Sequence, residues 1–273
     1  MENSERAKEK RRDIIKISTA AVIYLLLFIP EEFDWWLNDF IWEQFPDMPF
    51  YLHLISYSYI IYVIVHVLLI RFALRHTFKE AGFIWNKETT IIALFCAFYL
   101  PLTTFLTYIT TDVWWPIEFY FLIAVSNFLL TALYEELFHR GFLSNKLFKF
   151  VSGRRSFIIV VLISALFFCT AHVQKWVGEI QFYDTFTYLI DNLTLVFGMG
   201  VWTAVYYFYT KNLTVCIILH GAHNCIVNFT STVWASFVFC WGFWAVAVVL
   251  LFVKVKKSDF NALVQKWGAY AKT

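Results

Sequence analysis

The chain has little of what keeps the surface of a soluble protein in water. Of its 273 residues only 15% are charged, and it has nine glycines, five prolines and no low-complexity linker. Hydrophobic residues make up 60% of the chain, aromatic residues alone make up 21%, and the mean hydropathy is +0.62. These proportions exclude an ordinary soluble globular domain and favour an integral membrane protein.

Cysteine is scarce as well, and its five positions show no spacing typical of a metal centre. All five fall inside apolar stretches, where a free thiol behaves as a small apolar residue. They are Cys96, Cys169, Cys216, Cys225 and Cys240. The chain also lacks internal repeats and any charge run beyond a basic head and a basic tail. We therefore expect a single membrane domain over residues 1–273.

Apolar stretches long enough to cross a membrane recur along the whole chain. About 20 helical residues span roughly 30 Å of hydrocarbon. Eight such stretches lie at residues 14–30, 50–71, 90–110, 116–139, 157–174, 186–209, 213–229 and 233–253. The first follows a basic head but is too long, and too poor in small residues for cleavage, to be a removable signal peptide. The sequence predicts an all-α, polytopic integral membrane helical bundle with about eight transmembrane helices.

The placement of lysine and arginine predicts the orientation of this bundle, because cytoplasmic connections are enriched in both. Basic residues crowd the head at 1–13, the connection at 71–87 and the tail at 254–273, whereas the first outside loop carries carboxylates and tryptophans. Both termini are therefore expected in the cytoplasm. In the sequence, the head and the tail flank a transmembrane bundle at 14–253, whose catalytic core is expected at about 116–230. Spaced apolar residues in the tail are compatible with a membrane-surface helix and equally with a solvated segment.

Two adjacent carboxylates, Glu135 and Glu136, lie in the fourth apolar stretch. An ionised side chain at the centre of a bilayer costs about 2.5–3.5 kcal/mol on insertion scales, so an intramembrane acid is first considered functional. The two side chains point about 100° apart on a helix, which indicates different roles. Glu136 and Arg140 have the i, i+4 spacing of a same-face ion pair. Glu135 is then the carboxylate left to take a proton from water.

Three further polar residues are predicted at the depth of Glu135. The fourth helix is expected to continue to a break near Gly153, from which Glu135 lies 18 residues back and His172 lies 19 residues forward. An antiparallel hairpin would bring these two side chains level. His220 is expected about 13 Å inside the cytoplasmic boundary, and Asn224 lies one helical turn later on the same face. The four side chains are thus predicted to share one layer of the bilayer.

Three short motifs carry these residues and resemble those of the CPBP family. They read Glu-Glu-Leu-Phe-His-Arg-Gly at 135–141, Phe-Cys-Thr-Ala-His at 168–172 and His-Gly-Ala-His-Asn at 220–224. That family comprises CAAX prenyl endopeptidases and bacteriocin-processing or self-immunity membrane proteins. The resemblance covers mainly residues 116–230, and it rests on three motifs that match in order and spacing.

The resemblance implies an intramembrane glutamate-dependent endopeptidase. Glu135 with His172 would polarise a water molecule for attack on the scissile carbonyl. His220 and Asn224 would donate hydrogen bonds to the developing oxyanion. A structural or substrate-binding role is expected for Glu136, Arg140 and Phe168. No cofactor is required by this chemistry.

The expected substrate is a membrane-associated peptide or protein tail, with or without an attached lipid, that reaches a cytoplasm-facing cavity. The lipid bilayer is the other expected partner, and no feature indicates nucleic acid. We accordingly expect a multi-pass protein of a cell membrane. The sequence does not indicate an oligomeric state.

A metal site is the sharper alternative for the same residues. Glu136 and His139 have the i, i+3 acid–histidine spacing of di-iron helices, but a second Glu-x-x-His is missing. Zinc held by Glu135, His172 and His220 stays open, since zinc accepts such ligands.

Non-enzymatic alternatives also stay open. The acidic and basic groups can lock helices together without catalysis, or the protein can serve bacteriocin immunity or regulation while keeping the site. A proton-coupled transporter is less well supported, because repeated helices broken by glycine or proline are missing. His53, His66 and His76 are expected to be packing residues, and His139 is expected to face away from the site or toward the headgroups.

Overall fold

The computed structural model describes residues 11–12, 14–19, 22, 31–46, 57–68, 71, 77–111, 117–179, 185–229 and 233–269. Every regular element with bounds in these ranges is a helix, as the all-α prediction requires. The predicted stretches at 14–30 and 50–71 are described only in part, and His53 and His76 lie outside the described residues.

The helices with described bounds begin with α2 (Glu31–Gln44), α3 (Tyr57–Leu68), α4 (Phe78–Ala81) and α5 (Lys87–Thr111). One continuous helical run then contains α6 (Ile117–Val125), η3 (Ser126–Thr131), α7 (Ala132–Glu136), η4 (Leu137–Ser144), α8 (Asn145–Leu147) and η5 (Phe148–Phe150). The last five are α9 (Arg154–Glu179), α10 (Thr185–Thr210), α11 (Leu213–Phe229), α12 (Val233–Lys256) and α13 (Phe260–Ala269).

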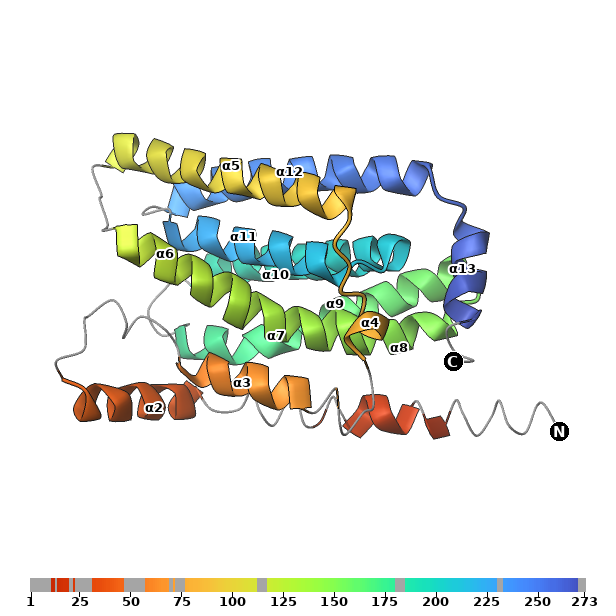
Figure 1. The fold of residues 1–273 in the computed structure, drawn as a ribbon, viewed down its shortest axis with the longest axis horizontal. Helices are drawn as coiled ribbons and strands as arrows, with labels where there is room; N and C mark the ends of the chain where they lie inside the picture. The colour runs from red at the N-terminus through yellow and green to blue at the C-terminus, as the bar shows by residue number, and fades with distance from the viewer. Residues whose placement is uncertain are drawn as a thin grey trace.

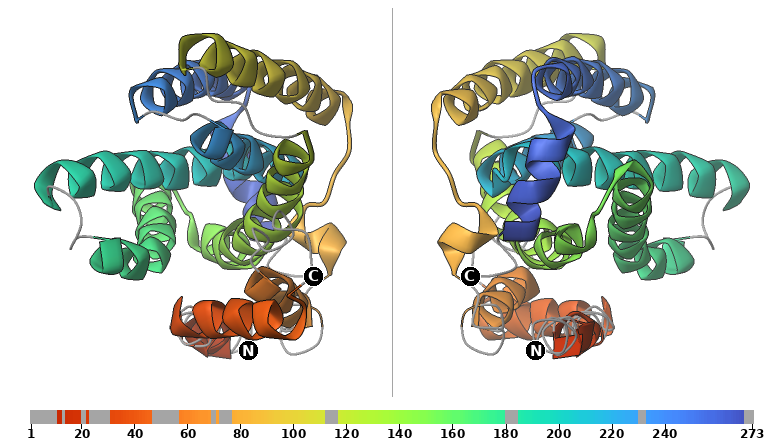
Figure 2. Two further views of the ribbon diagram at one scale, coloured as in Figure 1. Left: turned by 90° about the vertical axis from the view of Figure 1, so that its left-hand side faces the viewer. Right: turned by 90° about the vertical axis from the view of Figure 1, so that its right-hand side faces the viewer.

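The long helices lie in layers (Figures 1 and 2), and α10 runs obliquely across α9. α5 and α12 form one outer layer, α10 and α11 lie beneath them, and the run from α6 to α8 lies below with α9. α2 and α3 cover the opposite outer side. This arrangement brings the three motif-bearing segments, on α7, α9 and α11, into the interior of the bundle.

The helical run from Ile117 to Phe150 confirms the expected continuation past Glu136. Two π-helical segments, η3 and η4, flank the short α-helix α7 that carries both carboxylates. π-Helical turns inside α-helices are rare and occur mainly at functional sites. Within η4 the Ser144 hydroxyl donates to the His139 carbonyl (2.7 Å) and lies 2.7 Å from the hydroxyl of Ser164 on α9. These contacts stabilise the wider turn and tie it to α9.

The expected break after this run is confirmed at Val151–Gly153, and α9 begins at Arg154. The Ser156 hydroxyl oxygen accepts hydrogen bonds from the backbone N–H groups of Ser152 and Gly153 (2.9 and 3.0 Å). It thereby satisfies donors at the helix start that have no partner within the helix. The chain reverses direction here, as the antiparallel hairpin predicted (Figure 1).

One end of the bundle gathers the basic connections, at the right of Figure 1. There, α4 begins with a capping box made by Thr77 and Glu80 and ends at Gly82, whose φ of 89° favours glycine. The Gly82 carbonyl accepts from the Leu213 N–H (2.8 Å), and the Tyr207 hydroxyl donates to the Ala81 carbonyl (2.7 Å). α4 is thus fixed to α10 and to the start of α11.

The tail is not a plain solvated segment, because it forms a helix, α13, whose apolar residues pack against the bundle; the membrane-surface alternative stays a prediction. α13 packs onto the basic end through Trp267, which is 2% exposed and donates to the Phe208 carbonyl (2.9 Å). Its ring lies beside Phe148 and Tyr207, and the Lys211 amine lies 5.4 Å from its centroid. The spaced apolar residues of the tail therefore bury against protein.

Two helical stretches in the described residues are long and apolar enough to cross a membrane, Lys87–Ile109 and Phe119–Phe150. Many apolar side chains of the outer helices are exposed, among them Phe98 on α5 and Phe252 on α12 (69% and 66%). This surface suits a membrane protein. The count of eight spans stays a prediction, and the expected first outside loop is helical in its described part, as α2.

Candidate active site

Glu135 lies in the interior of the bundle, 4% exposed, between α9 and α11. Its Oε2 atom is 3.8 Å from Nε2 of His172 and 3.7 Å from Nε2 of His220. Its Oε1 atom accepts a hydrogen bond from the hydroxyl of Tyr134 (3.2 Å). Glu135, His172 and His220 therefore lie close together, as their predicted common depth in the bundle requires. Oε2 is buried and has no hydrogen-bond partner among the described residues.

Glu136 forms the second half of the site and is fully buried. Its Oε1 atom accepts from Arg140 Nη1 (3.0 Å) and from His220 Nδ1 (2.9 Å). The ion pair expected from the i, i+4 spacing is thus present. Arg140 is also fully buried, and its Nη2 donates to the carbonyl of Gly200 on α10 (3.2 Å). The arginine thereby offsets the buried charge of Glu136 and connects α7, η4 and α10.

The position of the ring hydrogen can be assigned in His172 and His220, because Nδ1 of each ring lies beside a hydrogen-bond acceptor. His172 Nδ1 lies 2.9 Å from the carbonyl oxygen of Phe168, which can only accept, so Nδ1 carries the hydrogen. His220 Nδ1 donates to the carboxylate of Glu136. In their neutral forms both rings therefore present an Nε2 lone pair toward Glu135 Oε2.

Phe168 is fully buried, and its ring packs against the charged and histidine side chains of the site. The Arg140 guanidinium lies over its ring, 4.4 Å from the centroid. The rings of His139, His172 and His220 lie 5.0, 4.9 and 5.6 Å from it. A cation over an aromatic face is attracted by the ring quadrupole, more strongly when desolvated. Of the two roles expected for Phe168, its burial supports the structural one.

Two glycines allow the close helix contacts on which the site depends. A Cβ atom on Gly200 would lie 3.1 Å from Cα of Ala165, so α10 approaches α9 closely at the carbonyl that Arg140 uses. A Cβ atom on Gly221 would lie 2.5 Å from the ring of Phe128, which holds α11 against η3 beside His220. Neither role is visible in the sequence, where the two glycines look like ordinary small residues.

Asn224 and His223 complete the α11 motif. Asn224 is partly exposed, and its side chain makes no hydrogen bond to a residue that the structure describes. It lies one turn beyond His220, as expected. His223 is 6% exposed and its Nδ1 accepts from Trp244 Nε1 on α12 (3.1 Å). His223 is therefore a packing residue outside the carboxylate cluster.

The expectation that His139 faces away from the site or toward the headgroups is wrong. Its side chain is fully buried, with the ring edge-on to Phe168 and Phe138. η4 continues past this position and α9 packs over it, so the side chain has no path to the membrane surface. His66 is buried as a packing residue, as expected, against Tyr134 and Phe138.

Within the described ranges no group of three or more His, Cys, Asp or Glu side chains has the arrangement of a metal site. The distances of 3.7 and 3.8 Å around Glu135 Oε2 lie within about 0.4 Å of the roughly 3.4 Å between two ligands of a tetrahedral zinc ion, so zinc stays an open alternative.

Tyr134, Gly200 and Ser144 contribute to the site without having been predicted. Tyr134 directly precedes the first carboxylate, so its position in the sequence was an available signal. The carbonyl of Gly200 and the hydroxyl of Ser144 act through contacts between helices, for which residue spacing gives no signal.

A comparison with known families agrees with this geometry. Residues 117–226, about two-fifths of the chain, match the family described as Type II CAAX prenyl endopeptidase Rce1-like. The matched segment contains all three motifs, so the resemblance predicted from them is confirmed. No curated protein and no solved structure matches the chain.

Proposed function

We propose that this chain, whose residues 117–226 belong to the Rce1-like CAAX prenyl endopeptidase family, is an intramembrane endopeptidase that uses Glu135 as its base. One observation carries the proposal. A buried carboxylate oxygen without a hydrogen bond to any described residue lies within 4 Å of two imidazole nitrogens. A water molecule at this point can donate one hydrogen to Glu135 Oε2 and the other to an imidazole Nε2.

The water oxygen then attacks the scissile carbonyl carbon as its proton passes to Glu135. Breaking the C–N bond requires a proton on the departing amine, and Glu135 can return the one it took. Of the groups in the cluster, His172 is the more accessible histidine, with 20% of its side chain exposed against 1% for His220. The peptide would therefore approach from the side of His172 and the partly exposed Asn224.

Stabilisation of the oxyanion would come from α11. The Asn224 amide has hydrogens available to donate, because no described residue accepts them. His220 can donate from Nε2 only when its ring is protonated, and the carboxylate of Glu136 at Nδ1 would stabilise that charge. Arg140 and Glu136 would act as positioning residues that hold His220, rather than by touching the substrate.

The substrate we propose is a membrane-associated protein tail, in keeping with the prenylated substrates that the family name describes. The test uses the full chain, purified in detergent, and a fluorogenic prenylated peptide. Glu135→Gln preserves the size of the side chain but removes the base, so kcat should fall about 10²- to 10⁴-fold. Glu43→Gln, an exposed position on α2, should cleave like wild type.

Cleavage by Glu135→Gln at more than a tenth of the wild-type rate would remove Glu135 as the base. The zinc alternative is tested on the same preparation, because loss of activity on chelation and recovery with zinc would replace the metal-free mechanism. A Glu135→Gln protein that folds and still confers the cellular phenotype would favour an immunity or regulatory role over proteolysis.

A further inference from the structure

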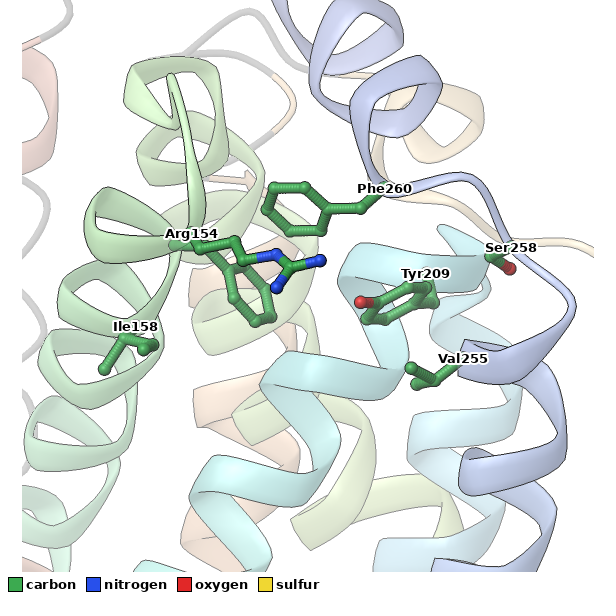
Figure 3. Close-up of a pocket in the computed structure, with 7 residues that line it drawn as sticks. Arg154, Ile158, Tyr209, Val255, Ser258 and Phe260 are labelled. Atoms are coloured by element: carbon green, nitrogen blue, oxygen red, sulfur yellow. The ribbon is translucent and has the colours of Figure 1, made fainter.

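A separate pocket of about 360 Å³ lies at the basic end of the bundle (Figure 3). It is lined by Arg154, Phe157 and Ile158 of α9, Tyr209 of α10, Val255 of α12, and Ser258 and Phe260 at the start of the tail. Arg154 precedes His172 by 18 residues on the same helix, about 27 Å at 1.5 Å per residue. The pocket is therefore distinct from the carboxylate cluster.

The polar groups of the pocket are suited to an anion. Figure 3 shows the guanidinium of Arg154 extending into the space between Phe260 and Tyr209. Arg154 makes no ion pair with a described residue, and the Tyr209 hydroxyl has no hydrogen bond within the same ranges. The Ser258 hydroxyl donates to the Lys254 carbonyl (2.8 Å), which leaves its oxygen free to accept only. Arg154 and Tyr209 are thus two available donors in one pocket.

The remaining walls are apolar. The ring of Phe157 lies 4.6 Å from that of Phe208 and 5.6 Å from that of Phe260, which links α9, α10 and α13. Away from the basic end, α9 exposes Ile158 of the pocket wall and its neighbour Ile159 (55% and 56%). On the α12 side Phe252 is 66% exposed. A ligand held by Arg154 would therefore meet apolar surface on its way out along the helices.

The charge around the pocket favours the same class of ligand. Arg155, Lys256 and Lys257, next to lining residues in the sequence, are exposed and outnumber the exposed carboxylate of Asp259. Basic clusters of this kind at a membrane boundary attract anionic lipid headgroups, with about 1 kcal/mol per basic residue near the surface. A donor pair, an apolar exit and a basic rim together match a molecule with an anionic head and a hydrocarbon chain.

We propose that this pocket binds an anionic phospholipid from the leaflet at the basic end. The phosphate accepts hydrogen bonds from Arg154 and Tyr209, and an acyl chain follows Ile158 and the exposed apolar face of α9. The bound lipid would join α9, α10, α12 and the start of α13. The inference depends on the chain being a membrane protein and is independent of the proposed proteolysis.

The experiment measures lipid binding to the full-length protein in detergent by native mass spectrometry and thermal unfolding. Phosphatidylglycerol is compared with phosphatidylcholine of the same acyl chains, and the former should bind preferentially and raise the unfolding temperature. Arg154→Met should weaken phosphatidylglycerol binding about ten- to a hundredfold, the range for losing a hydrogen bond to a charged group. Arg155→Met removes the same charge next to the pocket and should retain binding.

Tyr209→Phe removes only the hydroxyl and provides a second test should Arg154→Met fail to fold, with a smaller loss expected. Equal binding of the two lipids would overturn the proposal. So would equal losses in Arg154→Met and Arg155→Met, which would indicate only a general surface charge. Inorganic phosphate is added as a separate arm, and an unfolding temperature raised as much by it as by phosphatidylglycerol would identify a soluble anion in place of a lipid.

Discussion

The buried carboxylate cluster and the basic end of the bundle differ in how their charged side chains are exposed and paired. Glu136 and Arg140 are completely buried, and Arg140 meets a carboxylate, a carbonyl and an aromatic face. At the basic end, Arg154 and Arg155 are exposed, and the Glu88–Lys254 ion pair is 30% and 37% exposed. Exposed pairs contribute roughly 0–1 kcal/mol, whereas breaking a buried pair costs about 3–5 kcal/mol. Burial therefore decides how much each charge matters to folding.

The largest expected effect comes from removing one member of the buried pair. Arg140→Met leaves Glu136 without its cation and Phe168 without the guanidinium over its ring. We expect unfolding to become easier by about 3–5 kcal/mol, measured by thermal or chemical unfolding in detergent. Arg155→Met makes the same chemical change at an exposed position and should stay within about 0.5 kcal/mol of wild type.

A double variant separates loss of the charge pair from loss of packing. In Arg140→Met with Glu136→Gln the carboxylate that Arg140 neutralised is gone as well, and the glutamine oxygen can still accept from His220. Its stability should recover part of what Arg140→Met loses. A double variant no more stable than the single one would show that Arg140 acts through packing and not as a counter-charge.

An intermediate effect is expected where the cluster depends on a close backbone contact. In Gly200→Ala the new methyl group would lie 3.3 Å from Cβ of Ala165, so α10 must shift by a few tenths of an ångström together with the carbonyl that Arg140 uses. We expect a loss of about 1–3 kcal/mol, and a lower rate of peptide cleavage because Arg140 positions Glu136.

Gly198→Ala is the matched control on the same helix. A Cβ atom there has no neighbour within 4 Å, so the substitution should be neutral or stabilise by up to about 1 kcal/mol. Equal effects of the two substitutions would show that the contact at Gly200 is not required. Both are followed by unfolding in detergent and by the peptide assay.

Residue spacing predicted the cluster well because helices convert sequence separation into depth. Counting from Gly153 placed Glu135 level with His172, and the i, i+4 rule found the pair of Glu136 and Arg140. Spacing could not show that His220 contacts both carboxylates, since this depends on the distance between α7 and α11.

Two features were predicted wrongly or left ambiguous for similar reasons. His139 was expected to face away from the site, but helical spacing says nothing about a neighbour such as α9 that covers the same face. The apolar pattern of the tail was compatible with a membrane-surface helix and equally with a solvated segment, and packing against protein was not predicted. The rings that pack around Trp267 belong to Phe148, Tyr207 and Phe208, which come from distant parts of the chain, so residue spacing in the tail gives no signal for this contact.

The smallest expected effect concerns Lys211. This side chain is partly buried, so its exposure is between that of the carboxylate cluster and that of the exposed basic residues. Burial lowers the pKa of its amine from 10.5 to about 8, Glu80 opposes this shift, and Lys266 and Lys149 add to it. A lowered pKa in the folded protein means that the unfolded chain binds the proton more tightly. The contribution of Lys211 to stability should therefore increase as the pH rises from about 8 to 10.5.

Lys211→Met removes this titration, so the variant should gain on wild type at pH 7 and lose more than half of that advantage by pH 9.5, with the rest lost toward pH 10.5. The change in unfolding temperature should be no more than about 3 °C, because the residue is partly exposed and also gives up its contact with Trp267. Lys257→Met, at an exposed position, supplies the control for removing one positive charge from the basic end. A difference between Lys211→Met and wild type that stays constant from pH 7 to 9.5 would mean that Lys211 titrates like its exposed neighbours. In that case, of the two regions compared, burial would change the contribution of charged groups to stability only in the carboxylate cluster.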